Sequence, residues 1–256
     1  MKTSNYILPN NMCSKHSIPP KYNLIEKCYR SKLGIIAYAN YTSLASCQRL
    51  GIDKRGLAIN WYPPEEQPVQ SVQHSCEILK CAETESGLSL ENDTRFDYYS
   101  LYGRPLPNIN STCVPGLGMF FLHTIQQNFT DSQRVCKNMS GVMADVTTEQ
   151  RTEALAQLLT GLSVESAFVG LLRKNTSSFS GTDGLSLDCF TYRAWAPGHP
   201  RRDFNQFDCV LITKQRTWHA TSCKKKYPAL CELIPGGPYK RRSIFEYRRR
   251  SEHPGK

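Results

Sequence analysis

Eleven cysteines are spread along the 256-residue chain and constrain its fold more than any other feature. They are Cys13, Cys28, Cys47, Cys76, Cys81, Cys113, Cys136, Cys189, Cys209, Cys223 and Cys231. Their positions do not follow the short paired spacings of zinc fingers, and a dispersed set of this size predicts disulfides, which persist in the secretory pathway. Because the number is odd, at least one thiol is left without a partner. It is a free cysteine, an intermolecular link, or half of a bridge to a missing start of the chain.

Asparagine triplets point to the same compartment. An Asn-x-Ser/Thr sequence begins at Asn40, Asn92, Asn110, Asn128, Asn138 and Asn175. Such triplets are glycosylated only in a chain that enters the secretory pathway. The sequence therefore predicts an extracellular glycoprotein.

The start of the chain does not match this prediction. Residues 1–11 (MKTSNYILPNN) contain no run of about 7–15 apolar residues that would form the core of a signal peptide. We expect the true start to lie upstream, and the alternative is a cytosolic chain with free thiols.

The net charge of +10 divides equally between the end of the chain and the rest of it. Residues 235–256 carry seven Lys and Arg against two acidic residues, a net +5, and predict a basic disordered tail. The alternatives for this tail are cleavage at Arg248-Arg249-Arg250 or binding to polyanions. The remaining +5 is spread over 234 residues and does not predict nucleic-acid binding. No apolar run approaches the roughly 20 residues of a transmembrane helix, so we expect none.

Composition divides the chain into four segments. Residues 103–112 (GRPLPNINST) concentrate Gly, Pro and polar residues, a pattern typical of a domain boundary. We expect a leader or linker at 1–23, a cysteine-containing module at 24–103, a second module at 113–234 and the tail at 235–256.

The second module has the pattern of an α+β domain. Apolar spacing predicts a helix from Phe129 and a second helix that Thr148 caps and that ends near Leu158 or Leu159. Short apolar runs predict strands at 142–146, 167–172, 209–213 and 228–233. An irregular loop from Arg173 to about Phe207 separates the second and third of these strands.

Several motifs of this module appear in an order that resembles the C-type lectin-like domain. They are Cys136, Gly141, Ala144, Glu149, Phe168-Val169-Gly170-Leu171, Trp195-Ala196-Pro197-Gly198-His199-Pro200, Asp208-Cys209-Val210, Trp218, Cys223 and Ala229-Leu230-Cys231-Glu232. The resemblance covers about 120 residues. It implies two helices, small antiparallel sheets and a long irregular loop, with bridges from Cys136 to Cys231 and from Cys209 to Cys223.

The calcium ligands of that family have no counterpart here. Sugar binders of the family hold calcium through Glu-Pro-Asn or Gln-Pro-Asp and through an Asn-Asp pair after the second tryptophan. This chain has His199-Pro200-Arg201 and His219-Ala220 at those positions. Calcium prefers about 6–8 oxygen ligands, so we expect no calcium-dependent sugar binding. His199, His219 and an acid such as Asp203 would make a poor zinc site, and we expect no metal and no cofactor.

Basic residues gather in the same region. Arg193, His199, Arg201, Arg202 and His219 are the candidate ligand-binding residues, flanked by Lys214, Arg216 and Lys224-Lys225-Lys226. Guanidinium and ammonium groups suit carboxylate or sulfate ligands, and the alternative is a solvated face. Phe204 and Phe207 are candidate protein anchors, although Phe207 also suits a core position. The acids Asp183, Asp188, Asp203 and Asp208 are interpreted as turn formers.

The first module shows a weaker resemblance. A helix-like SLASCQRL with Cys47, the strand-like GLAINW and then SCEILKC have the order of a PAN or apple module, an extracellular adhesion domain. That family has a cysteine just before the first of these strands, where this chain has Arg55-Gly56. The alternative is an unclassified disulfide-bonded extension. Cys113 is expected to pair either with Cys189 or with this module.

The function predicted from these patterns is binding. None of the six histidines lies in a nucleophile elbow, a His-Glu-x-x-His helix or a phosphate-binding loop, so we expect no enzyme. We interpret the chain as a secreted, calcium-independent C-type lectin-like adhesion protein of the extracellular matrix or cell surface. We expect its partner to be a glycan or an extracellular protein, with an acidic ligand favoured by the basic residues. The alternative is an immune recognition lectin that binds microbial or acidic glycans.

Overall fold

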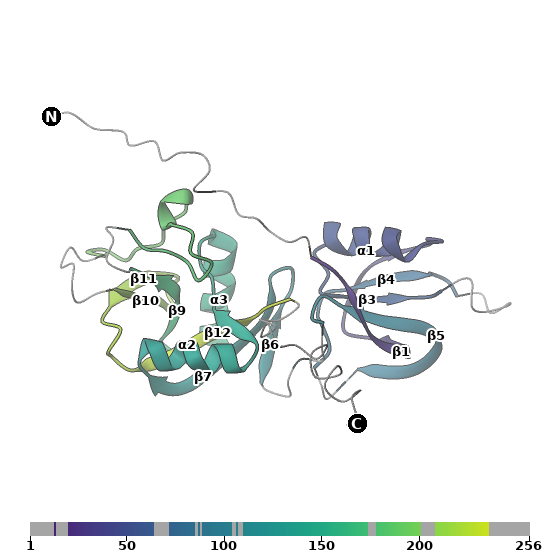
Figure 1. The fold of residues 1–256 in the computed structure, drawn as a ribbon, viewed down its shortest axis with the longest axis horizontal. Coiled ribbons are helices and arrows are strands. Elements are labelled where there is room, and N and C mark those ends of the chain that lie inside the picture. Colours follow the sequence, from purple (N-terminus) through teal and green to yellow (C-terminus); the bar gives the residue numbers. More distant parts are fainter. Residues whose placement is uncertain are drawn as a thin grey trace, which may run out of the picture. The chain divides into compact units, whose positions relative to one another are not determined.

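The computed structural model describes residues 13, 20–63, 72–84, 87, 89–103, 106, 110–173, 178–200 and 208–235. The predicted basic tail after residue 235, most of the leader, Asn175, Arg201, Arg202, Asp203, Phe204 and Phe207 lie outside these residues. The chain forms two compact units (Figure 1). The N-terminal unit is Pro20–Phe121 with Cys136–Gly141 and the residues from Leu233. The C-terminal unit is Leu122–Val135 and Val142–Glu232 with the segment that contains Cys13.

The N-terminal unit is an antiparallel five-stranded sheet with one helix against it. The strands are β1 (Asn23–Ser31), β2 (Ile35–Ala39), β3 (Ala58–Trp61), β4 (Cys76–Leu79) and β5 (Leu90–Ser100), in the order β1-β5-β3-β4-β2. Helix α1 (Leu44–Asp53) contacts β3 and β4. Its N-cap is Ser43, whose hydroxyl accepts a hydrogen bond from Ser46 N. The helix and strands predicted around Cys47, 56–61 and 75–81 therefore lie where the sequence indicated.

Apolar cores cover both faces of the central strands. Ile59 and Ile78, which are register partners, lie in the core that includes Cys47 of α1. Ala58 and Leu79 point to the other core, with Tyr98 and Tyr102. Since both faces are covered, every residue of β3 and β4 is buried, and apart from Asn60 and Glu77 these residues are apolar or cysteine.

The C-terminal unit contains two helices, most of a second sheet and a long loop. The helices are α2 (Phe129–Asn138) and α3 (Glu149–Gly161), and a 3-10 turn, η2 (Leu187–Cys189), lies in the loop. The strands are β6 (Ser111–Val114), β7 (Gly118–Gln127), β8 (Gly141–Met143), β9 (Ser166–Leu172), β10 (Cys209–Thr213), β11 (Trp218–Thr221) and β12 (Tyr227–Leu233). Their order is β11-β10-β9-β12-β7-β6, with β8 beside β12. The boundary between the units falls within β7.

The predicted α+β fold class is confirmed, with one difference in the sheet. The strands join one seven-stranded sheet instead of several small antiparallel ones, because β12 pairs with β9 in parallel. Strand β8 is shorter than predicted, since the chain leaves the sheet after Met143. Thr148 caps α3 as expected, accepting a hydrogen bond from Arg151 N.

The glycine of the Phe168-Val169-Gly170-Leu171 motif has a packing reason. Gly170 N donates to Ala144 O at 2.8 Å. A Cβ at this position would lie 2.7 Å from Met143 O and 2.7 Å from Thr182 Cγ2. Any side chain would therefore push β9 away from the end of β8 and from Thr182 of the long loop.

Ten of the eleven cysteines form disulfides. Four pairs are Cys13–Cys189, Cys47–Cys76, Cys81–Cys113 and Cys209–Cys223. Cys136 and Cys231 are also disulfide-bonded, and since the other eight are taken they are partners of each other. The free thiol is the exposed Cys28. Cys113 thus pairs within the N-terminal unit and not with Cys189, a choice that the spacing left open.

No helix in the described part of the chain is long and apolar enough to cross a membrane. Four of the sequon asparagines, Asn40, Asn92, Asn110 and Asn138, are exposed. Asn128 differs because it is the N-cap of α2: its Oδ1 accepts from Asp131 N at 2.9 Å and its Nδ2 donates to Asp131 Oδ2 at 2.7 Å.

Loss of the bridge between α1 and β4 should destabilise the N-terminal unit. Cys47 and Cys76 are 29 residues apart in sequence. The free energy of unfolding of a Cys47→Ala/Cys76→Ala double variant should therefore be about 3–4 kcal/mol lower than that of the parent. Chemical denaturation under oxidising conditions measures this change. Cys28→Ser is the matched control and should leave the midpoint unchanged, and equal stability of the double variant and the parent would contradict the prediction.

Asn128 should be the least occupied sequon among the described asparagines. Glycosylation would replace a hydrogen on the amide nitrogen that donates to Asp131, at a half-buried position. When the chain is secreted from mammalian cells, Asn128→Asp should keep the cap and leave the glycan mass unchanged by mass spectrometry. Asn138→Asp is the control and should remove one glycan. A loss of one glycan from Asn128→Asp would show that the site is used.

Candidate functional site

The long loop between β9 and β10 is closed at its base by Arg173 and Asp208. Arg173 N donates to Asp208 O at 2.8 Å, and the Arg173 guanidinium pairs with Asp208 Oδ1 at 3.1 Å. The same guanidinium lies 5.1 Å from the centre of the Phe179 ring. The Arg173 side chain is only 5% exposed, whereas that of Asp208 is 34% exposed, so the pair holds the two ends of the loop together from a half-buried position.

Of the acidic residues expected to form turns, Asp183 and Asp188 do so, whereas Asp208 pairs with Arg173 instead. Asp183 Oδ1 accepts a hydrogen bond from Leu185 N at 3.1 Å. Asp188 Oδ2 accepts one from the Ser186 hydroxyl at 3.2 Å, at the start of η2. The Cys13–Cys189 bridge adds a covalent tie at the end of η2. The carboxylates therefore have structural partners within the loop.

Two tryptophans fix the segment that carries His199. Trp195 and Trp218 contact edge to face, with ring centres 5.5 Å apart. Ala196 N donates to Trp218 O, and Trp218 N donates to Ala194 O at 2.7 Å. The loop thus runs beside β11. The residues after Ala196 therefore lie next to the residues that follow Trp218.

This arrangement brings His199 and His219 together. Their ring centres are 4.7 Å apart, and both side chains are half-buried. His199 Nδ1 accepts a hydrogen bond from Ala220 N at 3.0 Å, and His219 Nε2 lies 3.2 Å from Thr217 Oγ1. The two segments that the sequence singled out separately are therefore neighbours in space.

The donor atoms of this pair do not suit calcium. Imidazole nitrogens stand where oxygen ligands are needed, and His199 Nδ1 is already bound to the Ala220 N–H. In the described part of the chain, no group of three His, Cys, Asp or Glu side chains is arranged to hold a metal ion. The residues therefore do not fit the ion that the fold family implies.

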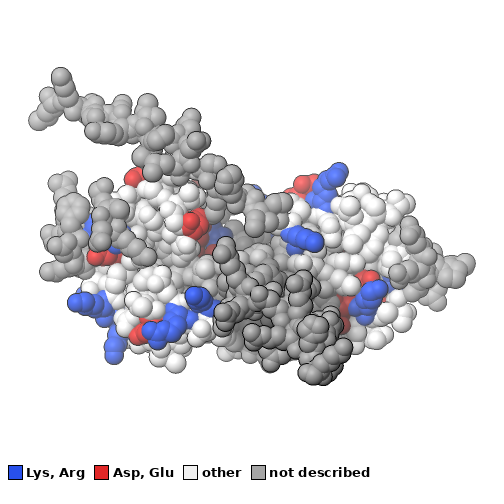
Figure 2. All heavy atoms as spheres, viewed as in Figure 1, with Lys and Arg blue, Asp and Glu red and all other residues white. Residues whose placement is uncertain are grey.

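The basic candidates have different environments. The Arg193 guanidinium donates to the backbone oxygens of Leu187, Phe190 and Tyr192 at 2.7–2.8 Å, so it organises the loop around η2. Lys214 pairs with Glu165 at 2.5 Å and Arg216 with Glu153 at 2.9 Å. On the face in Figure 2, basic side chains lie in small separate groups, several of them beside acidic ones.

Lys224, Lys225 and Lys226 remain as the unpaired basic group. They are exposed in the turn between Cys223 and β12, and no ion pair joins them to another residue that the structure describes. We call these three residues the lysine turn. Arg201 and Arg202, the other candidates, lie outside the described residues.

A second concave site, which no motif indicated, lies in the N-terminal unit. It is a cavity of about 420 Å³ lined by side chains from β1, β2, β4 and β5, with Glu77 and Arg30 among them. The available sequence signal was an acid, Glu77, inside the otherwise apolar run of β4. A charged residue in a buried strand requires a partner, and that partner was not identifiable from the sequence.

Comparison with known proteins identifies the second half of the chain. Residues 125–233 match the model of the lectin C-type domain. Pulmonary surfactant-associated protein D of Sus scrofa is 31% identical over 112 residues, which are 42% of this chain and 29% of that protein. The protein of the same name from Bos taurus is 27% identical over 136 residues, 53% of this chain and 36% of that protein. The chain thus spans about a third of these relatives.

Solved structures with the same kind of domain are more distant. Human lithostathine is 19% identical with a TM-score of 0.43, over 48% of this chain and 87% of that one. A calcium-independent type II antifreeze protein is 19% identical with a TM-score of 0.40, over 48% of this chain and 95% of that one. Residues 125–233 therefore match a C-type lectin domain, and they follow a disulfide-bonded α+β region.

Proposed function

We propose that the C-type lectin domain binds an acidic glycan or an acidic extracellular protein without calcium. The observation that carries this proposal is the His199–Ala220 hydrogen bond, which occupies a nitrogen at the position of the family's metal ligands. With the metal chemistry replaced by imidazoles, recognition depends on the side chains of the chain itself. The lysine turn and the neighbouring basic residues offer charged donors that suit carboxylate and sulfate groups.

The setting that we propose is extracellular adhesion, in matrix or at a cell surface. Ten disulfide-bonded cysteines support an oxidising compartment. The exposed sequon asparagines support the same assignment.

We further propose that the N-terminal unit is a PAN-like or apple-like adhesion module. The Cys47–Cys76 bridge, which holds α1 against the sheet, supports this assignment together with the order of α1, β3 and β4. The missing cysteine before β3, where Arg55-Gly56 stand, marks the difference from that family.

Calcium should not bind to the protein at physiological levels. Titration of calcium into the full chain should give no heat above dilution up to millimolar concentration, because the donors at His199 and His219 are nitrogens. Ligand binding should be the same with and without a chelator. Micromolar calcium binding by calorimetry would overturn the calcium-independent assignment.

Retention on a heparin column should depend on the lysine turn and on Arg201 and Arg202. The parent should elute above physiological salt, and a Lys224→Gln/Lys225→Gln/Lys226→Gln variant should elute at clearly lower salt because three exposed cations are removed. Arg201→Ala/Arg202→Ala should shift elution in the same direction. Lys214→Gln is the matched control, since Glu165 already pairs with that lysine.

All of these variants keep the basic tail, so differences between them report on the domain. If the parent is not retained, or if the lysine-turn and double-arginine variants both elute with it, the acidic-ligand proposal is wrong.

A further inference from the structure

The cavity of the N-terminal unit has the construction of a ligand site. The residues that line it include Arg30 of β1, Tyr38 of β2, His74, Glu77 of β4, and Arg95 and Phe96 of β5. Tyr38 and Glu77 are direct register partners, as are Glu77 and Asn60 of β3. Directly opposed residues in a sheet project to the same face, so three strands present polar groups to one place.

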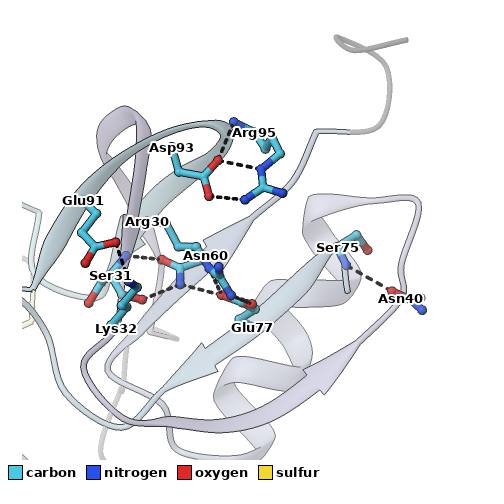
Figure 3. A network of polar contacts seen from close by, with 10 residues as sticks. All are labelled: Arg30, Ser31, Lys32, Asn40, Asn60, Ser75, Glu77, Glu91, Asp93 and Arg95. Atoms are coloured by element: carbon cyan, nitrogen blue, oxygen red, sulfur yellow. Dashed lines mark hydrogen bonds and ion pairs between the residues drawn. The ribbon is translucent and has the colours of Figure 1, made fainter. Parts of the chain in front are cut away.

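Glu77 is the fixed acid of this site (Figure 3). Its side chain is only 3% exposed, and Arg30 binds it with two bonds, Nε to Oε2 at 2.9 Å and Nη2 to Oε1 at 2.5 Å. Asn60 Nδ2 donates to Glu77 Oε2 at 2.8 Å, while Asn60 itself is held by the backbone N and O of Ser31. The network therefore holds Arg30 in one orientation.

Arg95 repeats this construction on the neighbouring strand. Its Nε and Nη2 donate to the two carboxylate oxygens of Asp93, each at 2.8 Å. The guanidinium carbons of Arg30 and Arg95 lie 4.9 and 5.9 Å from the centre of the Phe96 ring. One aromatic ring thus supports both cations. The hydrogen bonds that Arg30 donates to Glu77 and that Arg95 donates to Asp93 raise the pKa of each arginine, so both stay charged.

In both ion pairs the arginine is more exposed to water than the carboxylate. The side chains of Arg30 and Arg95 are 28% and 36% exposed, whereas those of Glu77 and Asp93 are 3% and 15% exposed. Neither Nη1 atom donates to a residue in the part of the chain that the structure describes. An incoming group therefore meets guanidinium N–H donors before it meets the carboxylates, and this favours an anion.

An aromatic face completes the cavity. Tyr38 is 53% exposed, and its ring centre lies 4.8 Å from that of His74. An exposed ring beside fixed polar groups suits a ligand that has both an apolar ring face and hydroxyl groups. The volume of about 420 Å³ lies at the small end of ligand pockets, which favours one or two rings over a long polymer segment.

We propose that this cavity is a second binding site, for the charged ring of an acidic saccharide. The carboxylate or sulfate of the ligand accepts hydrogen bonds from Arg30 and Arg95, and the sugar ring lies on Tyr38. The site lies outside residues 125–233, and it does not depend on what the C-type lectin domain binds.

Binding to the full chain tests this assignment by saturation-transfer NMR and calorimetry. Two probes separate the sources of the anion: methyl glucuronide for a carboxylate and N-acetylglucosamine 6-sulfate for a sulfate. At least one should bind, and methyl glucoside, which is neutral, should bind about tenfold more weakly or not at all. If neither acidic probe binds, or if the neutral sugar binds equally well, the proposal is wrong.

Variants assign the binding to the cavity. Arg95→Gln should weaken binding about tenfold or more, because it removes a guanidinium without leaving a fully buried acid behind. Lys32→Gln is the matched control. Lys32 is an exposed cation directly after β1 that pairs with the exposed Glu91, and its loss should change affinity little. Equal effects of the two substitutions would indicate a general charge effect and would contradict the assignment of binding to this cavity.

The ring contact is tested separately. Tyr38→Ala should weaken binding while Tyr38→Phe should retain it, because stacking needs the ring and not the hydroxyl. Circular dichroism and thermal melting confirm that each variant is folded. If inorganic sulfate or acetate binds as tightly as the sugars, or if a short glutamate-containing peptide binds more tightly, the saccharide class is wrong. His199→Ala, in the C-type lectin domain, should leave this binding unchanged.

Discussion

The C-type lectin domain depends on the contacts that Trp218 makes. The side chain is fully buried, and its indole nitrogen donates to Thr152 Oγ1 of α3 at 3.2 Å. Trp195 and Tyr192 of the long loop meet the ring edge to face, each with ring centres 5.5 Å apart. A loop without regular secondary structure has little core of its own. One aromatic side chain therefore joins the helix, the sheet and the loop, and it places His199 beside His219.

The features that were predictable from the sequence are those with local causes. Thr148 caps α3, and compact apolar runs formed β9, β10 and β12, because capping and burial act over a few residues. Strand β5 was missed because its first half is polar and pairs with the edge strand β1, so that only Phe96, Tyr98 and Ser100 are buried. Cysteine partners outside the family pattern depend on tertiary structure, and no spacing identifies them.

The candidate sites also differ in how far the sequence alone could identify them. The sequence singled out His199 and His219 because they replace family ligands, and the structure brings these residues together. Arg193 was selected for its charge, but charge alone does not distinguish a side chain directed to a ligand from one that binds three backbone oxygens of its own loop. The N-terminal cavity needed Arg30 and Glu77, which are 47 residues apart, to meet across the sheet.

Buried polar groups also define the register of the N-terminal sheet. Asn60 and Glu77 share a face with Ala58 and Leu79, opposite the core beneath α1. A slip of one residue in β3 or β4 would move an amide or a carboxylate into that apolar core, where an unpaired charge is very costly. The buried Asn60 and Glu77 therefore disfavour a shifted strand alignment.

The disulfide between Cys13 and Cys189 spans 176 residues and encloses the whole N-terminal sheet between its ends. During synthesis from the N-terminus, the bridges at Cys47–Cys76 and Cys81–Cys113 have both cysteines available by residue 113. Cys13 must wait for Cys189, and Cys136 waits for Cys231. While the sheet forms, the unpaired Cys13 is therefore present together with the free Cys28 and with the four cysteines of these two bridges. The emerging chain needs either rapid folding of that sheet or an isomerase to keep these thiols from exchanging partners.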